Sequence, residues 1–381
     1  MAASANPPVA VAAGPHFLAD LYSFQWSAFS FRLPLVSAAA VAVCLFAGVL
    51  MGHPGAGLVA GGGAFTVGFG ANQRISDSRL IPMIAAVFAT TTAALAGTLA
   101  GHRDYWLLIA AAGSALIYGV LSTRHTGLAW VGQQAFIALV VASAFPTGPG
   151  PAFARAGLIA AGGIVQFLIT STALCFRHLR RDIVCMSARF LATLRDEDRS
   201  LLQAVRRIPV AFPPLPPRQS LVYCLRLLVT ILIATEIYRR SGLQSGYWIP
   251  MTALLVQKPA FSETLTRGSL RVLGTMAGAW LGSLFIAHVA PRPEILAAIT
   301  AVFALLAYAT NAVNYGLYTA FLTGYIVFLL SLNQIPGSEI AHRRLWCTAL
   351  GAAIALVIHL DALRRLRASL RVPPSPAEKS A

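Results

Sequence analysis

Long apolar runs separated by short polar stretches dominate the chain between residues 33 and 360. Many of these runs hold about 17 to 21 residues, close to the ~20 that a helix needs to cross the hydrocarbon core of a bilayer. Helices of a soluble core would carry one polar face, whereas these runs are apolar on every side. The predicted helices cover approximately residues 33–51, 55–71, 80–100, 105–122, 127–146, 156–176, 220–238, 246–258, 270–289, 294–310, 316–332 and 345–360.

Composition agrees with this pattern, because 57% of the residues are hydrophobic and only 11% are charged. A soluble domain carries roughly 25% charged residues. The fold class predicted is therefore all-α, a polytopic membrane protein of about twelve transmembrane helices. The net charge of +16 does not indicate nucleic acid, because the arginines lie in the loops, where they set membrane topology.

Polar stretches divide the chain into five parts. Residues 1–32 form an N-terminal segment in which Phe17, Leu21, Phe24, Ala28 and Phe31 recur at helical spacing, so a short interfacial helix is predicted there. Residues 33–176 form a first six-helix half, and residues 220–360 form a second. Between them, residues 177–219 predict a helical cytosolic connector that ends in a Pro-rich linker. Residues 361–381 form a basic tail that is predicted to be partly disordered.

The two halves resemble each other in the spacing of their landmarks. Arg32, Arg79 and the pair Gly127-Leu128 are nearly as far apart as Arg226, Arg271 and the pair Gly316-Leu317. Each half has an even number of predicted helices, so both point the same way. This predicts two parallel six-helix repeats related by an axis along the membrane normal, an arrangement that transporters use.

Arginine placement also predicts orientation. With both termini in the cytosol, most Arg and Lys residues fall in cytosolic segments, as the positive-inside rule requires. Arg343 and Arg344 then belong to an outer loop before the last predicted helix. The protein is therefore expected to cross a membrane several times.

The segment from Gly246 to Thr275 stands out, because prolines and charges are crowded there between apolar runs. Pro250 is expected to remove a helical hydrogen bond and so to interrupt the helix 246–258. Interrupted helices in membranes tend to line cavities, where free backbone groups can bind a substrate. Trp248 and Thr252 lie on the same segment. A tolerated kink with an aromatic anchor is the alternative interpretation.

Three positive charges follow this helix. Lys258, Arg267 and Arg271 are expected on the cytosolic side, where they would attract anions. Glu263 lies four residues before Arg267, so the two side chains can pair on a helix. Ordinary positive-inside charge explains the same residues equally well.

The same segment resembles the FUSC family, which comprises fusaric-acid-resistance and aromatic-acid-exporter proteins. The matching residues are Trp248, Pro250, Thr252, Pro259, Thr264, Arg267, Arg271, Gly274, Thr275 and Gly278, with Asn314, Tyr315, Phe321 and Thr323 further on. The specific match covers roughly residues 220–360, and the first half matches in layout alone. The resemblance implies a bacterial inner (plasma) membrane as the location and export of aromatic or other weak organic acids as the activity. It also allows a periplasmic adaptor or a homo-oligomer as partner.

Together these features predict a secondary transporter, driven by the proton gradient, for a small organic anion. The substrate-binding residues expected are Trp248, Pro250, Thr252, Lys258, Arg267, Arg271, Thr323 and Tyr325. Glu236 is the candidate proton-coupling residue, and a surface ion pair with Arg239 and Arg240 is the alternative interpretation of it. The chain lacks the GxSxG, Walker A and HExxH motifs, so no enzyme, catalytic residue, cofactor or metal is predicted. A channel-like anion pore and a non-transporting scaffold that holds anionic lipid are the alternatives.

Overall fold

The structure is a computed structural model, and it describes residues 23–75, 78–101, 104–179, 218–243, 245–289, 292–333 and 337–370. Side chains are described within these ranges except at 175–179, 218–219, 337–338 and 360–370. Most of the interfacial segment, most of the connector and the end of the basic tail therefore lie outside the described residues.

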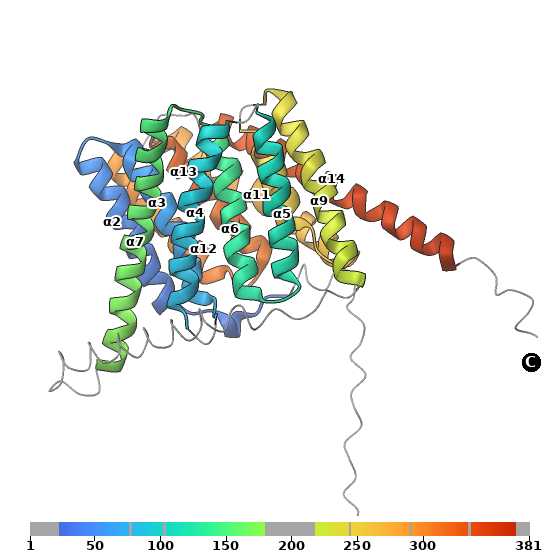
Figure 1. Cartoon of the computed structure of the whole chain (residues 1–381). Coiled ribbons are helices and arrows are strands. Elements are labelled where there is room, and N and C mark those ends of the chain that lie inside the picture. Colours follow the sequence, from blue (N-terminus) through green and yellow to red (C-terminus); the bar gives the residue numbers. More distant parts are fainter. Residues whose placement is uncertain are drawn as a thin grey trace, which may run out of the picture.

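Twelve α-helices make up the described part of the chain, as the hydrophobic pattern predicted, and Figure 1 shows them packed into one bundle. Their bounds are α2 Arg32–Leu50, α3 Pro54–Gly68, α4 Leu80–Ala100, α5 Tyr105–Ser122, α6 Thr126–Ser143, α7 Pro149–Leu179, α9 Arg218–Ser241, α10 Trp248–Val256, α11 Phe261–Val289, α12 Pro293–Thr310, α13 Tyr315–Ser331 and α14 Gly337–Leu370. Two short 3₁₀ helices, η1 Trp26–Ala28 and η2 Phe69–Asn72, complete the described elements.

Nine of these helices are long and apolar enough to cross a membrane, and α13 is a shorter apolar helix. The fold is therefore that of a polytopic all-α membrane protein. The helices α3 and α10, with 15 and 9 residues, are too short to span a bilayer alone. They occupy the second position in the two halves.

The same helix pairs pack together in both halves. In the first half α3 packs on α7, α4 on α6, and α5 on α6, and in the second half α10 packs on α14, α11 on α13, and α12 on α13. Single residues correspond as well. Gly162 lies against the backbone of Ala60, and Gly351 lies against that of Ile249. Gly351 follows Gly162 by the same number of residues as Ile249 follows Ala60, and this number is the offset between the two halves. These matches agree with the predicted repeat.

The caps of α6 and α13 give a further match at that offset. His125 accepts hydrogen bonds from the backbone N–H groups of Gly127 and Leu128, at 3.1 and 3.4 Å. Asn314 accepts from those of Gly316 and Leu317, at 2.8 and 3.1 Å. Each cap satisfies backbone donors that would otherwise lack a partner at the start of a helix.

Two apolar cores join the halves in a reciprocal way. In one core α5 and α6 pack with α9, α10 and α14, and in the other α12 and α13 pack with α2 and α3. The fourth and fifth helices of each half thus pack against the first two helices of the other half. Exchange of the halves leaves this arrangement unchanged, as expected for two parallel repeats about one axis.

Three predicted boundaries were wrong. The helix expected at 270–289 begins at Phe261, the helix expected at 156–176 begins at Pro149, and the helix expected at 345–360 begins at Gly337. These helices begin in polar sequence, so the apolar runs did not show where they start. Arg344, which was assigned to an outer loop, consequently lies within α14.

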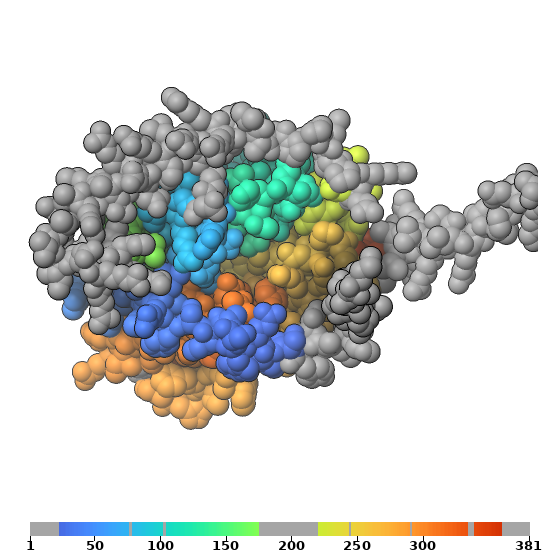
Figure 2. Space-filling model, turned by 90° about the horizontal axis from the view of Figure 1, so that it is seen from below, coloured from blue at the N-terminus to red at the C-terminus, as the bar shows by residue number. Residues whose placement is uncertain are grey.

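The end of the N-terminal segment lies on the second half. The described part contains a single 3₁₀ turn, Trp26–Ala28, in place of the expected helix. The backbone N–H of Gln25 donates to the carbonyl of Val313 at 3.0 Å, and Asn314 Nδ2 donates to that of Ser23 at 3.1 Å. Figure 2 shows these blue residues against the orange helices of the second half.

Two names are used below for the ends of the bundle. The Lys258 end is the end at which α9 begins, and the Glu236 end is the end at which α9 finishes, near residues 236–241. The Lys258 end is the lower one in Figure 1.

Candidate functional site

The site begins with α10, whose first turn contains Pro250. Because α10 starts at Trp248, the N–H group that Pro250 lacks is one that a helix leaves without an internal partner in any case. The carbonyl of Gly246 accepts from the N–H of Ile249 at 2.9 Å. The expected interruption at Pro250 was therefore wrong, and α10 is a separate short helix. Pro250 is buried, so it packs against protein.

Trp248 lies beneath the guanidinium group of Arg344. The Arg344 Cζ atom is 3.7 Å from the centre of the Trp248 ring, and the residues are 1% and 5% exposed. A cation over an indole ring in a site without water is stabilised by about 2 kcal/mol. Trp248, which was expected to contact substrate, thus holds the charge of Arg344 in place.

Thr323 of α13 fixes the other side of Arg344. The Nε and Nη2 atoms of Arg344 both donate to Thr323 Oγ1, at 3.3 and 3.2 Å. The third nitrogen, Nη1, is buried and has no hydrogen-bond partner among the described residues. The guanidinium is thus oriented through two nitrogens and keeps its remaining N–H groups available.

A second buried arginine, Arg271 of α11, lies near Arg344. Arg271 is 2% exposed, its Nη1 donates to the Tyr315 hydroxyl at 3.4 Å, and its buried Nε has no partner in the described part of the chain. The two guanidinium groups are close enough to interact electrostatically, and Tyr318 lies within electrostatic range of both. Two positive charges are therefore buried near each other inside the protein.

No carboxylate neutralises this pair within the described residues. The ion pairs that these residues form involve Glu236 and Glu339, which bind Arg239, Arg240 and Arg343. Taking an unpaired charge out of water costs several kcal/mol. Such a cost is characteristic of a functional site, and the missing negative charge is the one that an anionic ligand would bring.

Small residues on α11 let the arginines approach α13. A Cβ atom at Gly274 would lie 2.5 Å from the carbonyl oxygen of Gly316, and one at Gly278 would overlap the carbonyl oxygen of Ala320. Thr323 lies against the same Gly278 position. The glycines thus bring α11 close to α13 beside Thr323, which accepts hydrogen bonds from Arg344 of α14.

The other predicted arginine, Arg267, is exposed and contacts the same aromatic residue as Arg271. Its Cζ atom lies 4.9 Å from the centre of the Tyr315 ring. The expected ion pair between Glu263 and Arg267 is not formed, because Arg267 turns to that ring. Arg267 therefore lies between the Lys258 end and the buried pair.

Lys258 lies in the four-residue connection between α10 and α11. Its backbone N–H donates to Thr264 Oγ1 at 3.0 Å, and its carbonyl accepts from Thr264 at 3.3 Å. Burial and, to a smaller extent, the Arg267 charge lower the pKa of Lys258 to about 8, while the Glu263 charge acts in the opposite direction. Lys258 thus loses its charge in a pH range where an ordinary lysine keeps it.

We expect replacement of Lys258 by arginine to remove a pH dependence of anion binding. As pH rises from about 7 to 9, Lys258 loses its proton and the attraction for an anion weakens, whereas an arginine stays charged. The KM for a carboxylate that is ionised throughout this range should rise several-fold in the natural protein and stay level in Lys258→Arg. Initial rates of uptake by liposomes measure this, and equal profiles would show that Lys258 does not act on the anion.

The remaining predicted residues lie apart from the arginine pair. Tyr325 stacks on Phe65 of α3 with ring centres 4.0 Å apart, and its buried hydroxyl has no partner among the described residues. Thr252 lies where Gly351 of α14 approaches α10, and its buried hydroxyl likewise lacks a partner there. Tyr325 thus belongs to the contact between halves, and Thr252 to the contact between α10 and α14.

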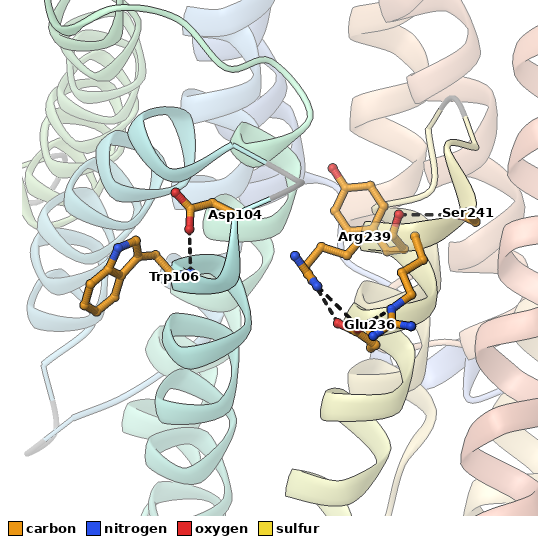
Figure 3. Close-up of polar contacts among 7 residues, drawn as sticks. Asp104, Trp106, Glu236, Arg239 and Ser241 are labelled. Atoms are coloured by element: carbon orange, nitrogen blue, oxygen red, sulfur yellow. Dashed lines mark hydrogen bonds and ion pairs between the residues drawn. The ribbon is translucent and has the colours of Figure 1, made fainter.

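Glu236, the candidate proton-coupling residue, forms ion pairs with two arginines. Figure 3 shows its carboxylate beside Arg239, whose Nε donates to it at 2.8 Å, and Arg240 Nε contacts the second oxygen. Arg239 in turn lies 4.1 Å from the centre of the Tyr105 ring. This arrangement favours a structural ion pair at the Glu236 end.

We expect Glu236→Gln to leave the pH profile of transport unchanged. The carboxylate is already held in its charged form by Arg239 and Arg240, so it would not release and rebind protons during each cycle. Rates measured at a series of pH values on each side of the membrane test this. A profile that flattens in Glu236→Gln would restore Glu236 as the proton-coupling residue.

Sequence reasoning missed Arg344, although a signal for it was present. The position equivalent to Arg344 in the first half is Arg155, at the offset that relates Gly162 to Gly351. Arg155 is half-buried and donates to the carbonyl of Phe145 at 2.5 Å. An arginine at the same position in both repeats, Arg155 and Arg344, could have identified it.

Comparison with known proteins agrees with the resemblance noted in the sequence. Residues 231–358 match the sequence profile of the family described as fusaric acid resistance protein-like. An uncharacterized protein of Synechocystis is 28% identical over 142 residues, which cover 37% of this chain and 19% of that protein. The inner membrane protein YccS of Escherichia coli is 31% identical over 134 residues, which cover 35% of this chain and 18% of YccS.

An uncharacterized protein, ORF2, of Neisseria gonorrhoeae is 29% identical over 133 residues, which cover 35% of this chain and 32% of ORF2. The matched part thus spans less than two thirds of each of these relatives. No solved structure matches the chain. The matched region contains α10, α11, α13 and most of α14, which carry both buried arginines.

Proposed function

We propose that this membrane protein transports small organic anions, because residues 231–358 match the family described as fusaric acid resistance protein-like. The observation that carries the proposal is the buried pair Arg271 and Arg344, which lacks a carboxylate partner among the described residues and keeps N–H groups free. A carboxylate of the substrate neutralises this charge and accepts those hydrogen bonds. The anion thus supplies the partner that the described part of the chain lacks.

The direction proposed is export of aromatic or other weak organic acids across a bacterial inner membrane, driven by the proton gradient. YccS is named as an inner membrane protein, which supports the location. We place the Lys258 end and both termini in the cytosol, in accord with the positive-inside rule. Lys258 and Arg267 then attract the anion, which passes to the arginine pair between α11 and α14.

Movement of one six-helix half against the other would expose the site to each side in turn. The reciprocal cores support this mechanism, because each half contacts the other through the same pairs of helices. One anion site, formed by the second half, would serve the whole protein.

The test uses the full chain purified and reconstituted in liposomes loaded with a labelled aromatic carboxylate such as benzoate. Carboxylate flux that exceeds protein-free liposomes and rises with an imposed proton gradient supports a proton-driven carrier. Flux that persists at channel rates after a protonophore collapses the gradient would replace the carrier by an anion pore. The absence of flux for every carboxylate in a chemically diverse panel would contradict transport.

The scaffold alternative predicts a different outcome. If the basic connector holds anionic lipid or partner proteins, deletion of residues 179–207 should abolish the phenotype of the gene in cells without affecting insertion. Retention of carboxylate export by this deletion variant would count against the scaffold.

A further inference from the structure

A polar network at the Lys258 end joins α9, the connection between α10 and α11, and α14. His359 lies in the middle of this network, is 4% exposed and packs against Phe261, with ring centres 5.6 Å apart. Its Nε2 atom is 3.0 Å from the carbonyl oxygen of Lys258. On its other side is Arg226 of α9, whose Nη1 lies 3.0 Å from Nδ1 and 2.5 Å from Nε2.

These contacts require a neutral imidazole ring. A guanidinium group only donates hydrogen bonds, so one ring nitrogen of His359 must offer a lone pair to Arg226. With the proton on Nε2, the ring donates to the Lys258 carbonyl and accepts from Arg226 at Nδ1. With the proton on Nδ1, it accepts from Arg226 at Nε2, the nitrogen that Nη1 approaches more closely. Either neutral tautomer leaves one acceptor nitrogen for Arg226, whereas the doubly protonated ring leaves none.

The charge that contacts the ring is positive. Arg226 faces His359 from α9, and Lys258 in the α10–α11 connection contacts it through its backbone carbonyl. On α11 the exposed Glu263 and Arg267 act electrostatically on the Lys258 side chain. No carboxylate among the described residues contacts the ring. A second proton on His359 therefore replaces an attractive contact with Arg226 by repulsion between two cations.

Arg226 also holds the connection between the two helices. Its Nη1 donates to the carbonyl of Pro259 at 3.3 Å, and Thr230, one turn further along α9, donates to Gln257 Oε1 at 3.4 Å. Displacement of Arg226 would thus loosen the α10–α11 connection and the contact between α9 and α14 together. Lys258 lies within this connection, at the expected entrance for the anion.

We propose that His359 is the proton-responsive residue of this transporter. Its neutral ring accepts from Arg226 and so holds α9 against α14 at the Lys258 end, and protonation of the ring breaks this contact. One proton from the aqueous phase binds the ring nitrogen that accepts from Arg226. The proposal rests on the proposed transport function for its role in the cycle. The release itself is a property of the fold and can be measured without a substrate.

The first measurement is hydrogen exchange of the backbone amides of residues 257–264 in the purified full chain, corrected for the intrinsic pH dependence of exchange. Between about pH 7.5 and 4.5, a range that extends below the ordinary titration of imidazole because Arg226 opposes the second proton, protection in the natural protein should fall about tenfold. In His359→Asn protection should not change with pH, because the amide keeps a donor and an acceptor and does not bind a proton. Exchange that is independent of pH in the natural protein, or that keeps its pH dependence in His359→Asn, would overturn the proposal.

Arg226→Gln is the second variant, because without the guanidinium a protonated ring meets less repulsion, so the pH response should also be lost. His288→Asn is the matched control, since His288 is an exposed histidine near the end of α11 that contacts the carbonyl of Leu284. Its pH response should equal that of the natural protein.

The second measurement is the pH profile of carboxylate flux in liposomes. The profile of the natural protein should follow the hydrogen-exchange midpoint, and that of His359→Asn should be flat over the same range. If no variant transports any carboxylate, the transport function fails while the exchange data still decide whether His359 is a proton-sensitive contact. If flux is present but both profiles coincide, proton coupling at His359 is excluded and the transport function stands.

Discussion

Replacement of Arg344 by glutamine should weaken carboxylate transport about a hundredfold while making the protein more resistant to heat. The loss of a buried charge that meets a substrate carboxylate corresponds to about 3 kcal/mol. The gain in stability has the same origin, because Arg344 and Arg271 lie together without a carboxylate partner among the described residues. A neutral amide removes the cost of that buried charge and still reaches Thr323 with its amide group.

Flux at several substrate concentrations and a melting curve in detergent measure the two effects. Arg343→Gln is the matched control, because Arg343 is the residue next to Arg344 in α14 but does not belong to the site. Its Nη2 atom binds Glu339 Oε1 at a distance of 2.6 Å. The control should transport normally and melt at the same temperature or slightly lower. If Arg344→Gln keeps the KM of the natural protein for every carboxylate tested, the arginine pair is not the anion site.

Gly278→Val should damage both folding and transport, since a valine side chain has no room at this position. Its Cβ atom would overlap the carbonyl oxygen of Ala320 and lie 2.9 Å from Thr323 Cβ. The backbones of α11 and α13 would have to separate, and overpacking of this kind costs about 3 kcal/mol. Because Thr323 orients Arg344, transport should fall even in the fraction that inserts correctly.

Gly157→Val provides the comparison, because a Cβ atom at Gly157 meets nothing within 4 Å. Both substitutions place the same residue in a membrane helix, so they differ mainly in the space around the side chain. Melting temperature and the yield of folded protein are the measurements. Equal melting temperatures for the two variants would show that α11 and α13 can separate at little cost.

The number and order of helices could be predicted because a bilayer imposes simple requirements. Backbone groups in hydrocarbon must bond within the helix, and side chains must be apolar over a fixed length. The starts of α7, α11 and α14 could not be predicted, because these helices extend beyond the apolar run into polar residues such as those from Phe261 to Arg267. Hydropathy shows which residues of a helix lie in lipid, but the helix itself can extend into the polar residues on either side.

The candidate site was predicted in part. The segment around Trp248 and Arg271 was singled out for its charge and aromatic residues, and the structure brings both residues close to Arg344. The error at Pro250 arose because the start of α10 depends on the turn before Trp248, which hydropathy does not reveal. Arg344 was assigned to a loop together with Arg343, because a pair of arginines just before an apolar run usually faces water. Its burial depends on Trp248 and Thr323, which are distant in sequence.

The attachment of the N-terminal segment has a consequence for biogenesis. Ser23 and Gln25 bind the turn before α13, which the ribosome makes almost three hundred residues later. During synthesis this partner does not yet exist when residues 23–25 are made. The contact between Ser23 and Asn314 therefore forms only after the turn before α13 has been synthesised, late in the assembly of the bundle.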